Sequence, residues 1–160
     1  MSFRLGALRS SWPRVAVLTA LIVLAAASRL VPHPHNVTPL AALALFGGAH
    51  FRSRGLALAV PLGALLLGDL VLGLHVLVPF VYVGFAATVG LGRGLQGRRR
   101  ALPIAGATLA GALAFYLVTN FGVWWLLGTF SPTPEGLVAC YVAGLPYLAR
   151  SLGGNAVYVT

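Results

Sequence analysis

The chain has 160 residues, of which 59% are hydrophobic and 8% are charged, and its formal net charge is +9. A soluble domain typically has about 25% charged residues, so this sequence has too few polar side chains to cover a soluble globule. The composition excludes a soluble enzyme, a disordered tail and a secreted disulfide scaffold, and the single cysteine, Cys140, excludes an internal disulfide. We predict an all-α integral membrane protein with one multi-pass domain over residues 1–160.

Six apolar segments are candidates for membrane-spanning helices, and together they predict a bundle of about six transmembrane helices. A helix needs roughly 20 apolar residues to cross a hydrocarbon core about 30 Å thick. The segments are residues 15–31, 38–51, 55–73, 76–91, 101–130 and 137–160. The sequence stops without polar residues after the last segment, and we expect a short C-terminal tail to be missing.

Arginine residues fall in alternate connections between these segments. The groups are Arg4, Arg9 and Arg14 before the first segment, Arg52 and Arg54 after the second, and Arg93, Arg98, Arg99 and Arg100 after the fourth. The other connections contain no arginine and include Glu135. The positive-inside rule then predicts six crossings with both termini in the cytoplasm. The basic charge therefore indicates topology, and we expect the lipid bilayer as partner and no nucleic acid.

The first segment has two interpretations. Its basic start, its apolar run and the alanines at residues 25–27 resemble a secretory signal with its cleavage site. The alternative is a retained helix, on which Ala16 and Ala20 form a face of small side chains. Such a face serves either packing within this protein or docking of another membrane subunit.

Residues 32–39 cannot form a regular helix, because three of these eight residues are proline. The helix that follows, from about residue 39 to 51, rises only about 19 Å and is too short to span alone. We predict that the His-Pro segment is unwound backbone at membrane depth, which is typical of binding sites in transporters. An ordinary outer loop followed by a tilted helix is the alternative.

The same segment contains candidate ligand-binding side chains. In an extended stretch His33 and His35 point the same way, and Asn36 lies beside them. With His75 from the next outer turn, these histidines could also bind a metal. Two or three histidines without a cysteine or carboxylate cluster make that the weaker alternative.

Arg29 and Asp69 are charged residues inside the apolar segments. Arg29 follows Arg14 by fifteen residues, and Asp69 follows Arg54 by fifteen. Both therefore lie about 22 Å from the arginine side if helical, and we predict an ion pair between them in the outer leaflet. Such a pair either pins two helices or forms the polar floor of a ligand cavity.

Two side chains of the fifth segment complete the predicted ligand site. Asn120 follows Arg100 by twenty residues and lies near the outer side, where it could bind a ligand or a neighbouring helix. Trp124 either belongs to an outer aromatic belt or stacks on a flat ligand. The sequence contains no P-loop, dinucleotide fingerprint or nucleophile motif, so we expect no enzyme activity and no cofactor.

Several motifs resemble a family of small bacterial integral membrane proteins of unknown function. They are the runs from Arg29 to Pro39, from Ala44 to Ala49, from Thr119 to Trp124 and from Glu135 to Tyr141. The layout of six helices in turn resembles the substrate-binding S components of energy-coupling factor (ECF) importers. That resemblance implies capture of a vitamin or micronutrient near the outer face, in the bacterial inner membrane. It also implies that a transmembrane subunit coupled to two ATPases meets the face of Ala16 and Ala20.

Three functions follow as hypotheses. The first is an S-component-like subunit that captures a small solute. The second is a structural or assembly protein of the membrane without a solute, and the third is a metal-ion binder or channel.

Overall fold

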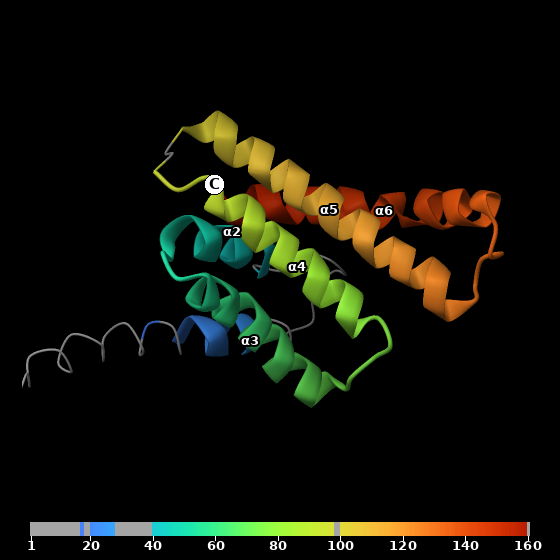
Figure 1. Ribbon diagram of the computed structural model, residues 1–160, viewed down its shortest axis with the longest axis horizontal. Coiled ribbons are helices and arrows are strands. Elements are labelled where there is room, and N and C mark those ends of the chain that lie inside the picture. The colour runs from blue at the N-terminus through green and yellow to red at the C-terminus, as the bar shows by residue number, and fades with distance from the viewer. Residues whose placement is uncertain (1–16, 18–19, 28–39, 98–99, 160) are drawn as a thin grey trace, which may run out of the picture.

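The computed structural model describes residues 17, 20–27, 40–97 and 100–159, and within them it is all-helical (Figure 1). A first helix covers residues 20–27. It is followed by α2 (Leu40–His50), α3 (Arg54–Leu72), α4 (Val78–Arg93), α5 (Ala101–Leu127) and α6 (Pro134–Val159). The predicted all-α class and the order of six helices are confirmed, with boundaries that move by three residues or fewer at most ends.

Local sequence explains where these helices begin and end. The Ser53 hydroxyl accepts a hydrogen bond from the Leu56 amide at 3.5 Å and caps the start of α3. Pro79 lies in the first turn of α4, where its missing N–H has no cost. Gly73 and Gly128 follow α3 and α5 with φ angles of 98° and 63°, a region that glycine enters freely.

Two of the described helices, α3 and α5, are long and apolar enough to cross a membrane. The apolar helices α2 and α4 are shorter, with 11 and 16 residues. The expected short second helix is therefore present, and it rises about 16 Å. The unwound segment predicted before it, residues 32–39, lies outside the described residues.

Helix α2 occupies the centre of the bundle and contacts α3, α4, α5 and α6. Glycines on both helices allow α2 and α4 to approach closely. An added Cβ on Gly48 of α2 would collide with the Val89 carbonyl of α4, and an added Cβ on Gly92 of α4 would collide with the Leu45 carbonyl of α2. Ala44 is fully buried beside them. A short helix without bulky side chains at these crossings therefore lets the longer helices close around it.

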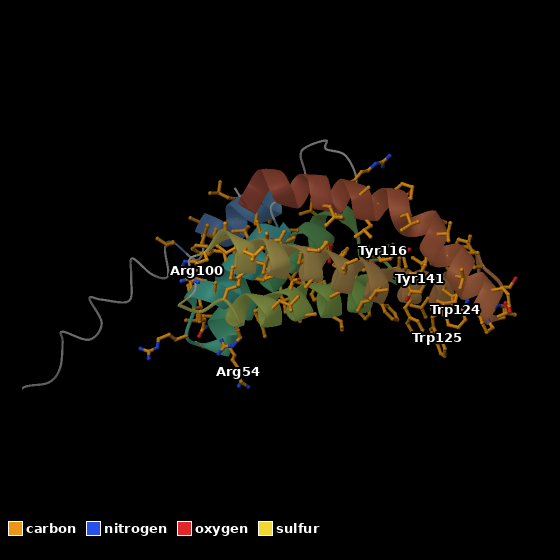
Figure 2. The ribbon with its side chains drawn as sticks, turned by 90° about the horizontal axis from the view of Figure 1, so that it is seen from above. Arg54, Arg100, Tyr116, Trp124, Trp125 and Tyr141 are labelled. Atoms are coloured by element: carbon orange, nitrogen blue, oxygen red, sulfur yellow. The ribbon has the colours of Figure 1, made fainter. Side chains whose placement is uncertain are left out.

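The connections between the helices gather at two ends of the bundle. The α2–α3 and α4–α5 connections lie at one end, and the α3–α4 and α5–α6 connections lie at the other (Figure 1). Figure 2 shows Arg54 and Arg100 at the first end, and Trp124 and Trp125 near the second. We call these the arginine end and the tryptophan end.

Candidate functional site

A cavity of about 490 Å³ lies between α5 and α6 toward the tryptophan end of the bundle. Leu77, from the connection before α4, and Phe130, from the α5–α6 connection, line it at that end. The helices contribute Thr119, Asn120, Cys140, Gly144 and Tyr147, among others. Its volume lies within the range of about 300 to 1,000 Å³ that small-molecule sites occupy.

Asn120 is the predicted ligand-binding residue that this cavity contains. Its side-chain Nδ2 donates to the Tyr116 carbonyl at 2.9 Å, one turn back in α5. Its Oδ1 lies against Gly144 of α6, so that a Cβ at residue 144 would collide with the amide. Asn120 is half-buried. Its side chain therefore contacts the neighbouring helix and also places a polar group on the cavity wall.

Hydrogen bonds from side chains to backbone hold α6 against α5 around the cavity. The Cys140 thiol donates to the Asn120 carbonyl at 3.3 Å, and Tyr116 donates its hydroxyl to the Tyr141 carbonyl. Tyr141 donates in return to the Leu117 carbonyl at 3.0 Å. In a bilayer such bonds replace water as partners for the polar atoms, so this wall of the cavity is fixed by the fold itself.

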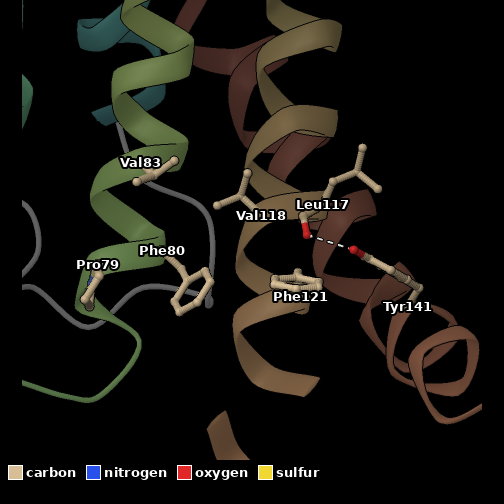
Figure 3. A pocket seen from close by; sticks show the side chains of 7 residues that line it. All are labelled: Pro79, Phe80, Val83, Leu117, Val118, Phe121 and Tyr141. Carbon is tan, nitrogen blue, oxygen red and sulfur yellow. Dashed lines mark hydrogen bonds between the residues drawn. The ribbon is translucent and has the colours of Figure 1, made fainter. Parts of the chain in front are cut away.

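A second cavity, of about 430 Å³, opens between α4 and α5 (Figure 3). Pro79, Phe80 and Val83 of α4 lie opposite Val118 and Phe121 of α5, and Leu117 of α5 and Tyr141 of α6 complete the lining. The hydroxyl of Tyr141 is already engaged with Leu117, as the dashed line in Figure 3 marks. This lining suits an apolar chain and lacks the few polar groups that orient a solute.

Asp69 is buried, with 2% of its surface exposed, in the last two turns of α3. The Tyr82 hydroxyl of α4 donates to its Oδ2 at 3.2 Å. Asp69 therefore lies at a buried contact between α3 and α4. Asp69 does not line either of the two cavities, and the partner proposed for it, Arg29, lies outside the described residues.

The other predicted site residues do not gather at one place. The indole N–H of Trp124 donates to the Ser131 carbonyl at 2.8 Å and fastens the α5–α6 connection, and Trp124 lines neither cavity. His75 is exposed between α3 and α4. Ala20 is exposed on the first helix, whereas Ala16, His33, His35 and Asn36 lie outside the described residues. Within the described part of the chain no three His, Cys, Asp or Glu side chains form a group that could hold a metal.

The α6 wall of the first cavity was not predicted. Cys140, Gly144 and Tyr147 follow each other at intervals of four and three residues, so they share one face of α6. That spacing is visible in the sequence. It also matches ordinary helix packing, and only the position of Asn120 opposite Gly144 identifies the face as a cavity wall.

Comparison with protein families gives a match over most of the chain. A family of unknown function, DUF6580, matches residues 9–160. No curated protein and no solved structure matches the chain.

Proposed function

The chain belongs to DUF6580, a family whose function is unknown, and we propose that it is a membrane-embedded subunit that binds a small solute, in the manner of an ECF S component. The observation that carries the proposal is the cavity at the tryptophan end, with the Asn120 amide on its wall. A cavity of this size with a few polar groups among apolar and aromatic ones is typical of solute sites.

The distribution of charge supports a position of this cavity at the outer side of the membrane. The arginine end contains Arg52, Arg54, Arg93 and Arg100. At the other end the connection between α5 and α6 contains no arginine, and Glu135 follows it in the first turn of α6. By the positive-inside rule we place the arginine end in the cytoplasm of a bacterial cell. The cavity then faces the outside, where an importer would capture its solute.

The test is thermal melting of the detergent-solubilised full chain with a panel of vitamins, nucleobases and divalent metal ions. At least one vitamin or nucleobase should raise the melting temperature, since a ligand that binds only the folded state stabilises it. Asn120→Ala should weaken that shift. Thr108→Ala is the matched control, because Thr108 is also a polar residue of α5 that hydrogen-bonds within its own helix, to the Ile104 carbonyl, outside the cavity.

The outcomes separate the three hypotheses. A shift by a metal ion alone would favour the metal binder built on His33, His35 and His75. A chain that no panel member stabilises would favour the structural membrane protein. Equal ligand-induced shifts in the melting temperatures of Asn120→Ala and Thr108→Ala would show that the cavity is not the solute site.

The transport partner is tested by co-purification. We propose that the small face of Ala16 and Ala20 meets a transmembrane coupling subunit, which brings two ATPases with it. Ala20 is exposed, as that role requires. Ala20→Trp should prevent association, because close helix contact needs small side chains, and it should leave the melting shift by solute unchanged. Association of Ala20→Trp with an unchanged complex would exclude this docking face.

A further inference from the structure

Hydrogen bonds join the two connections at the arginine end. Gln96, which follows α4, donates its Nε2 to the Gly48 carbonyl at 3.0 Å and to the Phe51 carbonyl at 3.3 Å. Arg93 donates to the Arg52 carbonyl at 3.5 Å. These carbonyls belong to the end of α2 and the turn after it, where helical partners are missing. The contacts hold the two connections, and the arginines on them, in a fixed relation.

The arginines at this end have no carboxylate side chain to pair with. The whole sequence contains two acidic residues, Asp69 and Glu135. Asp69 lies fifteen residues beyond Arg54 along α3, which is about 22 Å of helix rise, and it is buried against Tyr82. Glu135 lies in the first turn of α6, at the opposite end. The positive charges of Arg52, Arg54, Arg93 and Arg100 therefore remain uncompensated by acidic side chains.

Stabilisation of the helices does not explain these arginines. Arg54 is the first residue of α3, and Arg100 is the N-cap of α5 without a side-chain capping bond. A cation at a helix N-terminus opposes the helix dipole and is unfavourable there. Arg52, Arg54 and Arg100 are also exposed. Their charges are thus directed at something outside the bundle.

We propose that the arginine end binds the phosphate groups of anionic phospholipids such as phosphatidylglycerol. Both α3 and α5, which begin at this end, are long and apolar enough to cross a membrane, so their first residues lie at the level of the headgroups. The guanidinium group matches a phosphate with two parallel hydrogen bonds. Each arginine near an anionic surface increases binding about fivefold. This proposal rests on the membrane placement and not on solute binding.

The experiment uses the full chain in nanodiscs of phosphatidylcholine, to which phosphatidylglycerol is added in increasing proportion. The melting temperature should rise with phosphatidylglycerol, and added salt should weaken the effect. Arg54→Gln should raise the half-saturating proportion about fivefold, and Arg52→Gln combined with Arg54→Gln should raise it further. Neither guanidinium makes a hydrogen bond within the described residues, so these variants should fold.

Arg150→Gln is the matched control, because it removes the same charge from the middle of α6, where the guanidinium lies 5.7 Å from the Tyr147 ring centre. It should respond to phosphatidylglycerol like the natural chain. Equal loss in Arg54→Gln and Arg150→Gln would show an effect of net charge and overturn the site. Inorganic phosphate in neutral detergent should produce no comparable shift, and an equal shift would make free phosphate the ligand instead.

The same experiment separates this inference from the proposed function. A natural chain that inserts into the nanodiscs and melts identically in both lipids overturns the lipid site alone. A chain that does not insert overturns the membrane placement on which both proposals depend.

Discussion

Several polar residues in this protein join neighbouring helices. Cys140 and the tyrosines at residues 116 and 141 bond to carbonyls of the facing helix, and Asn120 lies against Gly144. Asp69 is held by Tyr82. Few polar side chains are available in such an apolar sequence, and the bonds of these residues lie between helices, where an unpaired polar atom would be costly in lipid.

Glu135 provides a prediction at this scale, because it is the acidic residue in the first turn of α6. Hydrogen bonds from its own backbone amide and from the Thr133 side chain lower the pKa of its carboxyl below the usual 4.5. Because the pKa of this carboxyl is lower in the folded than in the unfolded state, its ionised form stabilises the folded protein at pH values above the unfolded pKa. This contribution is lost as the pH falls through the folded pKa.

We therefore expect a small decrease in melting temperature as the pH is lowered below about 4.5 for the natural chain, and a smaller one for Glu135→Gln. Glu135 is exposed, so the difference should be modest. Melting curves of both chains across this pH range measure it. A natural chain and a variant with identical pH profiles would contradict the assignment.

The helices are arranged around close backbone contacts. A Cβ on Gly48 or Gly92 would meet backbone carbonyls of the facing helix, and one on Gly47 would lie 2.8 Å from the Ala57 carbonyl oxygen. That carbonyl has no helical N–H partner, because the residue four positions on is Pro61. The bare Cα of Gly47 can approach it as a weak C–H donor. Short α2 is thus fixed from two sides.

Substitution of these glycines tests the arrangement of α2 and α4. Gly92→Ala should destabilise the protein by at least about 1–3 kcal/mol, the usual cost of overpacking, because the obstructing atoms belong to the backbone and cannot rotate away. Gly90→Ala is the matched control on the same helix, since nothing lies within 4 Å of its added Cβ. It should be neutral or slightly stabilising, as alanine favours a helix.

The measurement is thermal melting in detergent at constant protein concentration. Similar melting temperatures for Gly90→Ala and Gly92→Ala would mean that α2 and α4 are farther apart than described. A decrease confined to Gly92→Ala would support the crossing.

The molecule as a whole has two chemically different ends. The α2–α3 and α4–α5 connections contain arginine, and the connections at the other end do not. Tryptophan and phenylalanine lie near that second end, with the Phe121 and Trp125 ring centres 5.8 Å apart. Both the proposed solute site and the proposed phospholipid site depend on this difference between the two ends.

Cysteine labelling tests the orientation of the two ends in the membrane. In a chain with Cys140 replaced by alanine, a cysteine introduced at residues 93–100 should react only from the cytoplasm. One introduced at residues 131–136 should react only from outside. Labelling of both from the same side would contradict the six-span topology, and protection of both would place these connections inside the membrane.

The sequence by itself determined the helical class, the order of the helices and the shortness of α2, because apolar length and the proline and glycine signals are local properties. It also indicated two ends, since the arginines alternate along the chain. The tertiary structure decided which polar residues meet. It separates Asp69 from the cavity that contains Asn120, uses Trp124 to hold a connection, and brings Cys140, Gly144 and Tyr147 to the cavity wall. These outcomes depend on how α5 and α6 rotate against each other, and helices that are apolar on most sides leave that rotation to packing contacts between distant residues.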